Sequence, residues 1–91
     1  MAEPITDYVL TLHARFEMER RGIAENTVQQ ILVAPDQRLP VRPGRDVLQS
    51  KVSSHGRTYL VRVIVDLDRK PAEVVTVYRT SKIEKYWRRE P

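Results

Sequence analysis

The chain has 91 residues, enough for one hydrophobic core, so we expect a single domain over residues 1–91. It has no cysteine and only two histidines, which excludes disulfides, Cys-based metal sites and multi-histidine metal clusters. No cofactor is expected. The first residues lack the apolar run of a signal peptide, and no apolar stretch is long enough to cross a bilayer. We therefore expect a cytoplasmic protein that does not bind membranes.

Positive charge is concentrated in the second part of the chain. The net charge is +4. Residues 1–37 have three arginines against six acids, a net charge of −3, whereas residues 38–91 have thirteen lysines or arginines against six acids, a net charge of +7. An acidic partner is therefore expected to bind to the second part of the chain.

The first third of the chain is predicted to form one strand and two helices. Residues 8–12 have β-branched and aromatic content, which favours a strand, although a helix that begins earlier is the alternative. Residues 13–21 favour a helix that ends before Gly22. A second helix over residues 24–34 has an apolar stripe and ends at Pro35. We expect the two helices to form a compact hairpin.

The middle of the chain is predicted to form a loop followed by a β-hairpin. Residues 36–44 contain two prolines and two arginines, which indicates a basic loop. Residues 45–53 are predicted to form a strand, and the glycine in residues 54–57 suits a tight turn into a strand over residues 58–67. That strand has one apolar face and one mixed face, and Arg62 lies in the middle of the mixed face.

The last third is predicted to add a strand and a helix. Residues 68–71 suit a turn, and residues 74–80 form another β-rich run. Ser81 and Glu84 match a capping box for a final helix, whose apolar stripe is Ile83, Tyr86 and Trp87. The predicted fold class is α+β: an N-terminal helical hairpin packed on an antiparallel sheet of three to four strands, with a C-terminal helix. The opposite face of the sheet is expected to be open.

Several stretches resemble the family called domain of unknown function 4258. They are His13–Ile23, Val28 through Ile31-Leu32 to Pro35, Tyr59–Val63, Val75–Arg79, Lys82-Ile83 and Tyr86. The resemblance implies a RelE-like fold, because that family is grouped with RelE/ParE-like and BrnT-like toxins. It also implies that the sheet face and the C-terminal segment bind RNA, and that an acidic antitoxin protein neutralises the domain.

Metal-independent cleavage of RNA needs a base near the 2′-hydroxyl, cations around the phosphate and a proton donor. On the first helix His13 shares a side with Glu17 and Arg20, which brings a base, an acid and a cation together. The alternative is structural: His13 caps or packs against the hairpin, and Glu17 and Arg20 form an ordinary surface ion pair.

Two strand arginines are candidate phosphate ligands. Arg62 is expected to be exposed on the open sheet face or paired with Asp66 or Glu73. Arg79 ends the last predicted strand, where its guanidinium and the N-terminus of the final helix could hold one phosphate. The alternative for Arg79 is an ion pair with an acid at the sheet edge.

The final helix contributes the remaining candidates. Tyr86 could stack on a base or donate a proton, but its spacing also suits a side chain that faces the core. Four cations could follow a phosphate backbone together with Arg20, or could simply form the solvated face of the helix: Lys82, Lys85, Arg88 and Arg89.

The leading hypothesis is a toxin-like, metal-independent ribonuclease of a toxin–antitoxin system, with catalytic residues His13, Arg62, Arg79, Glu17 and Tyr86. It requires His13 to lie across from Arg79. The alternative is a non-catalytic module that binds RNA or a protein partner through the same basic face. A further alternative is that the basic face chiefly binds an acidic antitoxin segment. The sequence does not determine the oligomeric state.

Overall fold

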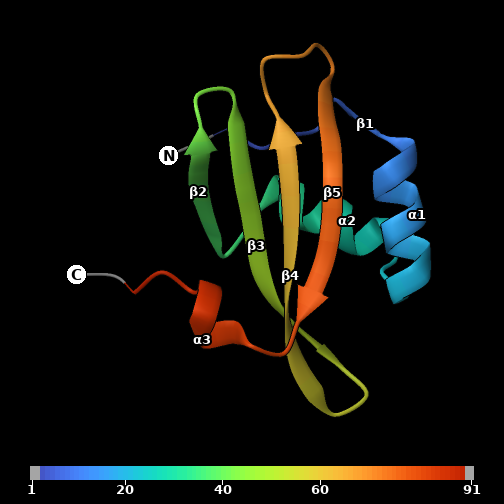
Figure 1. Ribbon diagram of the computed structural model, residues 1–91, viewed down its shortest axis with the longest axis vertical. Helices are drawn as coiled ribbons and strands as arrows, with labels where there is room; N and C mark the ends of the chain where they lie inside the picture. Colours follow the sequence, from blue (N-terminus) through green and yellow to red (C-terminus); the bar gives the residue numbers. More distant parts are fainter. Residues whose placement is uncertain (1–2, 90–91) are drawn as a thin grey trace.

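The computed structural model describes residues 3–89, which form a mixed five-stranded sheet and three short helices (Figure 1). In chain order the elements are β1 (Tyr8–Leu10), α1 (Leu12–Arg21), α2 (Glu25–Val33), β2 (Gln37–Arg42), β3 (Arg45–Ser54), β4 (Arg57–Asp66), β5 (Ala72–Thr80) and α3 (Ile83–Tyr86). The α+β class predicted from the sequence is confirmed. None of the helices in this part of the chain is long and apolar enough to span a membrane.

The strands are ordered β1-β5-β4-β3-β2 across the sheet. Strands β2 to β5 form an antiparallel meander, and the short β1 is parallel to β5, with Tyr8 opposite Ala72 and Leu10 opposite Val74. The first strand of the chain therefore lies beside the last one, at the edge opposite β2 (Figure 1).

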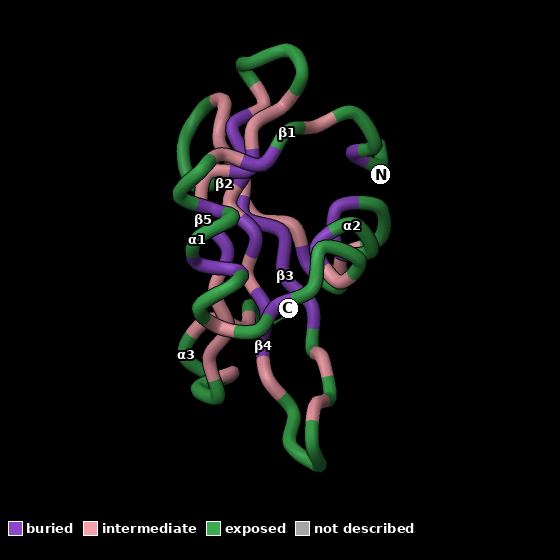
Figure 2. Tube along the Cα trace, turned by 90° about the vertical axis from the view of Figure 1, so that its right-hand side faces the viewer, coloured by how far each residue is buried: buried purple, intermediate pink, exposed green. Residues whose placement is uncertain are grey.

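One face of the sheet carries the hydrophobic core. Helix α1 packs along β5, and α2 packs across β3 and β4. Alternate β4 residues Val61, Val63 and Val65 point to this face because side chains of a strand alternate between its two sides. They contact Ala14 and Met18 of α1 and Val28, Ile31 and Leu32 of α2 in one buried cluster. Figure 2 shows α2 on one side of the sheet and α3 on the other.

The predicted architecture of a helical hairpin on an antiparallel sheet of three to four strands is wrong. The sheet has five strands and is mixed, because β1 pairs in parallel with a segment more than sixty residues later in the chain. The two N-terminal helices do not form a compact hairpin, since α1 packs mainly on β5 whereas α2 packs on β3 and β4. Each helix is therefore held by the sheet rather than by the other helix.

The predicted basic loop over residues 36–44 is also wrong in its larger part. Residues Gln37–Arg42 form the edge strand β2, which pairs with β3 through Gln49 to Arg45. Pro40 has no N–H to donate, so it is compatible with a strand only at the edge of a sheet. The pairing shifts register between Pro40 and Arg42. Proline thus marks the outer edge of the sheet here and does not exclude a strand.

The β3–β4 turn confirms the predicted glycine turn. His55 and Gly56 both have positive φ angles, 53° and 78°, between the paired residues Ser54 and Arg57. Two successive residues with positive φ suit a two-residue hairpin turn, and glycine adopts such angles without steric cost. The exposed tip of this hairpin extends beyond the rest of the sheet (Figures 1 and 2).

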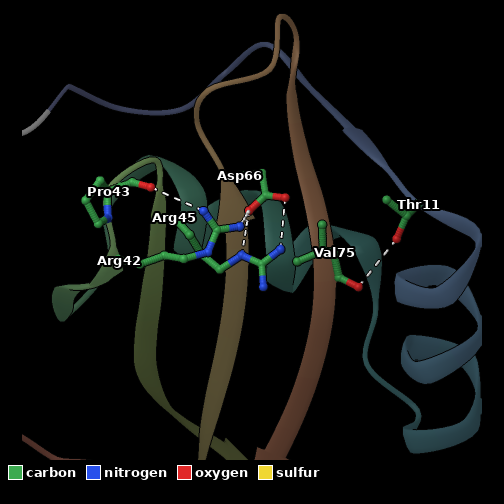
Figure 3. A network of polar contacts seen from close by, with 6 residues as sticks. All are labelled: Thr11, Arg42, Pro43, Arg45, Asp66 and Val75. Atoms are coloured by element: carbon green, nitrogen blue, oxygen red, sulfur yellow. Dashed lines mark hydrogen bonds and ion pairs between the residues drawn. The ribbon is translucent and has the colours of Figure 1, made fainter.

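An ion-pair cluster fixes the opposite end of the same two strands (Figure 3). Arg45 Nε lies 2.6 Å from Asp66 Oδ1, and Arg45 Nη2 lies 3.0 Å from Asp66 Oδ2, so the pair is bidentate. Arg42 Nη2 lies 3.9 Å from the same carboxylate. The hydrogen bond from Arg45 is the main cause of the lowered pKa of Asp66.

We predict that Asp66→Asn destabilises the fold in a pH-dependent way. The pKa of Asp66 is lower in the folded state, so its stabilisation is present above the unfolded pKa of about 3.9 and is lost as the pH falls through the folded pKa. The variant should melt a few degrees below wild type at pH 7, and the difference should shrink under acid conditions. Thermal unfolding followed by circular dichroism between pH 7 and pH 2 measures this, and a difference independent of pH would contradict it.

Candidate nucleic-acid interface

A row of four polar residues crosses the sheet face opposite α1 and α2, which we call the second face. Gln37 of β2 pairs with Gln49 of β3, Gln49 pairs with Arg62 of β4, and Arg62 pairs with Tyr78 of β5. Cross-strand partners point to the same side of a sheet. The four side chains therefore lie next to one another, and we call them the polar row.

Hydrogen bonds join the polar row from end to end. Arg62 Nε donates to Gln49 Oε1 at 2.8 Å, and Arg62 Nη1 donates to the Tyr78 hydroxyl at 2.5 Å. Gln49 Nε2 donates to Gln37 Oε1 at 2.8 Å. Gln49 has no solvent-exposed surface, so these bonds replace the water that its amide would otherwise bind. The guanidinium of Arg62 is thereby held in one orientation.

The C-terminal segment, residues 81–89, is bonded to the two glutamines. Gln49 Nε2 also donates to the carbonyl of Tyr86 at 3.1 Å. Gln37 Nε2 donates to the carbonyl of Arg88, and Gln37 Oε1 accepts from the N–H of Arg88 at 3.0 Å. Because of these bonds the segment crosses the lower part of the second face (Figure 1), and this face is only partly open.

Aromatic rings of the C-terminal segment lie against cations of the strands. The Arg62 guanidinium carbon lies 4.4 Å from the centre of the Tyr86 ring, and Lys51 Nζ lies 4.1 Å from the centre of the Trp87 ring. Tyr78 and Tyr86 meet edge to face, with ring centres 6.2 Å apart. Tyr86 is half-buried on the second face and belongs to this polar cluster rather than to the hydrophobic core.

Arg62 has no carboxylate partner in the part of the chain that the structure describes. None of the ion pairs among residues 3–89 includes Arg62, so neither Asp66 nor Glu73 pairs with it. Its Nη2 makes no hydrogen bond within this part of the chain. A fixed guanidinium with free N–H donors is suited to bind a phosphate or a carboxylate.

The C-terminal segment carries four cations on exposed positions. Lys82, Lys85 and Arg88 are exposed, and Arg89 Nη2 lies 3.2 Å from Glu84 Oε2 in an exposed ion pair. The predicted Ser81 cap is wrong: helix α3 has only four residues, begins after Lys82 and lacks a side-chain cap. Thr80 Oγ1 instead accepts from the N–H of Lys82 at 3.0 Å.

Arg79 lies on the other face of the sheet from Arg62. It pairs with Val61, a core residue, whereas Arg62 pairs with Tyr78. The Arg79 guanidinium carbon lies 4.6 Å from the centre of the Tyr59 ring. One phosphate cannot contact both arginines, because the sheet separates them. The structure therefore does not bring the two predicted phosphate ligands together.

His13 lies at the far end of β5 from Arg79. It follows Thr11, whose side chain caps α1 and donates to the carbonyl of Val74 at 3.0 Å near the start of β5. The Thr11 hydroxyl also lies 3.5 Å from the carbonyl oxygen of Val75 (Figure 3). The strand advances about 3.3 Å per residue, so Arg79 lies roughly 16 Å further along β5 than Val74. His13 is exposed, and the expected approach to Arg79 is absent.

Glu17 and Arg20 do form an ion pair, but Glu17 is not available as an acid or base. Glu17 as a residue is 8% exposed, and its carboxylate accepts from both Arg20 and Arg21 at 3.0 Å. These hydrogen bonds lower the pKa of Glu17 and keep it ionised. The geometry therefore favours the reading in which Glu17 and Arg20 form an ion pair without a catalytic role.

Within residues 3–89, histidine and acidic side chains form no group of three that could hold a metal.

A family model described as Domain of unknown function (DUF4258) matches residues 10–79. This chain belongs to that family. Neither the curated proteins nor the solved structures gave a match. The family resemblance inferred from the sequence is confirmed, and the relation to RelE/ParE-like and BrnT-like toxins stays a prediction.

The DUF4258 match contains the whole polar row but ends before the C-terminal segment. Sequence reasoning selected Arg62 and Tyr86 and missed Gln37, Gln49, Tyr78 and Lys51. Their positions on the second face depend on the register between four strands, which alternation within one strand does not give. The only local signal was that Arg62 lies on the mixed face of β4.

Proposed function

We propose that this DUF4258 domain binds single-stranded RNA on its second face, through Arg62 and the C-terminal segment. The observation that carries the proposal is the Arg62 guanidinium, which is oriented by Gln49 and Tyr78 and has no carboxylate partner among residues 3–89. Keeping an unpaired charge half-buried is unfavourable unless an anion completes the site.

Aromatic rings beside the cation favour a nucleic acid over a simple anion. Unpaired bases stack on aromatic side chains, and Tyr86 and Trp87 offer such rings beside Arg62 and Lys51. A cavity of about 290 Å³ lies between Lys51 of β3 and the C-terminal segment, whose lining residues are Ile83, Glu84, Trp87 and Arg89; Glu84 is paired there with Arg89. The exposed cations of the C-terminal segment add a longer-range attraction to the phosphate backbone.

A fluorescence anisotropy titration with labelled single-stranded RNA tests this proposal. We expect binding at low salt, with an affinity that falls linearly on a log–log plot as the salt concentration rises. A duplex of the same sequence should bind less well, since its bases are not free to stack. No binding at low salt, or equal affinity for the duplex, would overturn the proposal.

The second candidate is a metal-independent ribonuclease that an acidic antitoxin protein inhibits by covering the second face. It is favoured by the Tyr78 hydroxyl, which bonds directly to Arg62 and so lies beside the position proposed for the phosphate. In this ribonuclease the Tyr78 hydroxyl is the proton donor, and His13, which lies far from Arg62, takes no part in the reaction.

Incubation of RNA with the purified chain and a chelator separates the two candidates. A ribonuclease should cut under these conditions, His13→Ala should cut like wild type, and Tyr78→Phe should cut more slowly. Intact RNA that is nevertheless bound would select the non-catalytic function. Loss of cutting in His13→Ala would contradict the geometry proposed for cleavage.

A further inference from the structure

The face of the sheet that carries the helices has a cavity of about 180 Å³ beside Arg79. The turn between α1 and α2, together with Thr27 of α2, forms one wall, and strands β3, β4 and β5 form the other. The polar side chains on this side of the sheet that line it are Arg79, Tyr59, Thr27 and Ser54. We call this the Arg79 pocket. It is separated from the polar row by the sheet itself.

Two arginines share one aromatic ring at this pocket. The guanidinium carbons of Arg79 and Arg57 lie 4.6 and 5.9 Å from the centre of the Tyr59 ring, so they are no more than about 10.5 Å apart, the sum of these distances. None of the ion pairs among residues 3–89 includes either arginine.

The remaining polar groups of the pocket are hydroxyls. Ser54 is hydrogen-bonded to His55, and the side chain of Thr27 has no hydrogen bond within the described residues. The pocket therefore combines a guanidinium with hydroxyl donors and has no carboxylate in its lining. Its floor is apolar, formed by residues such as Val52 and Val61.

We infer that the Arg79 pocket binds a phosphate monoester, the group found on a mononucleotide and at the end of an RNA chain. Such a group carries close to two negative charges and three acceptor oxygens at pH 7. Arg79 binds two of these oxygens through its planar fork, and the hydroxyl of Thr27 donates to the third. The apolar floor accommodates the sugar.

Isothermal titration calorimetry with AMP on the full chain tests this site. Wild type should bind AMP, and Arg79→Gln should lower the affinity at least tenfold. Arg15→Gln is the matched control, because Arg15 is an exposed arginine of α1 with no part in either site, and it should bind like wild type. Thr27→Val changes no charge and should weaken AMP binding severalfold. It tests the site independently if Arg79→Gln does not fold.

A second arm identifies the source of the phosphate. Single-stranded RNA with a terminal phosphate is compared with the same RNA ending in a hydroxyl. If AMP does not bind but the terminal phosphate raises RNA affinity in wild type and not in Arg79→Gln, the pocket takes RNA ends. If neither AMP nor the terminal phosphate binds in an Arg79-dependent way, the inference is wrong. AMP binding without RNA binding would retain this site and overturn only the function proposed for the second face.

Discussion

Replacement of Arg62 by glutamine is expected to lower the affinity for single-stranded RNA roughly tenfold to a hundredfold. The guanidinium is the one strand cation of the polar row, and its loss removes a charge-assisted contact to phosphate. The slope of log affinity against log salt should also become shallower by about one, because one fewer counterion is released. Anisotropy titrations at several salt concentrations measure both quantities.

Two further variants show whether the guanidinium or merely a charge is required. Arg62→Lys keeps the charge but cannot bond to Gln49 and Tyr78 in the same way, so an intermediate affinity with a nearly unchanged salt slope is expected. Arg15→Gln removes an exposed arginine of α1 and should leave RNA binding unchanged. Equal losses in Arg62→Gln and Arg15→Gln would mean that only the total charge matters, which would exclude a defined site at Arg62.

Replacement of Gln49 by leucine is expected to have the largest effect on stability. Gln49 has no exposed surface and bonds to Arg62, Gln37 and the carbonyl of Tyr86, so leucine leaves several polar groups without partners. Each such group costs about 1–3 kcal/mol, which together lower the melting temperature by roughly 10 °C or more. The C-terminal segment should also loosen and become sensitive to trypsin at its lysines and arginines.

Thermal unfolding and limited proteolysis check this prediction together. Gln29→Leu is the matched control, because Gln29 lies exposed on α2 and its replacement should change the free energy of unfolding by less than about 0.5 kcal/mol. A Gln49→Leu variant that melts like wild type and resists trypsin would show that the polar row does not hold the C-terminal segment.

The sequence predicted local elements better than their pairing. Alternation at Val61, Val63 and Val65 defined β4 and its core face, and Gly22 correctly marked the end of α1. The sequence could not predict that β1 pairs in parallel with β5, since parallel pairing of distant segments leaves no local pattern. Strand β2 was predicted as a loop because of two prolines in residues 36–44. Proline is unfavourable in a central strand but is tolerated in an edge strand.

The candidate site was predicted only in part for a related reason. Arg62 and Tyr86 were both selected from the sequence, and they lie in contact. Arg79 was expected to stabilise the phosphate together with Arg62, but the face on which Arg79 lies depends on its register with β4, where it pairs with Val61. Gln37 and Gln49 carry no charge, and their importance comes entirely from burial, which the sequence does not report.

The bonds between the glutamines and the C-terminal segment involve only main-chain atoms of that segment. These hydrogen bonds therefore do not depend on which side chains residues 86 and 88 carry, provided that the backbone keeps its path. Substitutions at Lys85 or Arg88 can change the charge and shape offered to a partner without detaching the segment. Backbone hydrogen bonds thus hold the segment, while its exposed side chains can vary. This allows the binding preference to change while the fold stays constant.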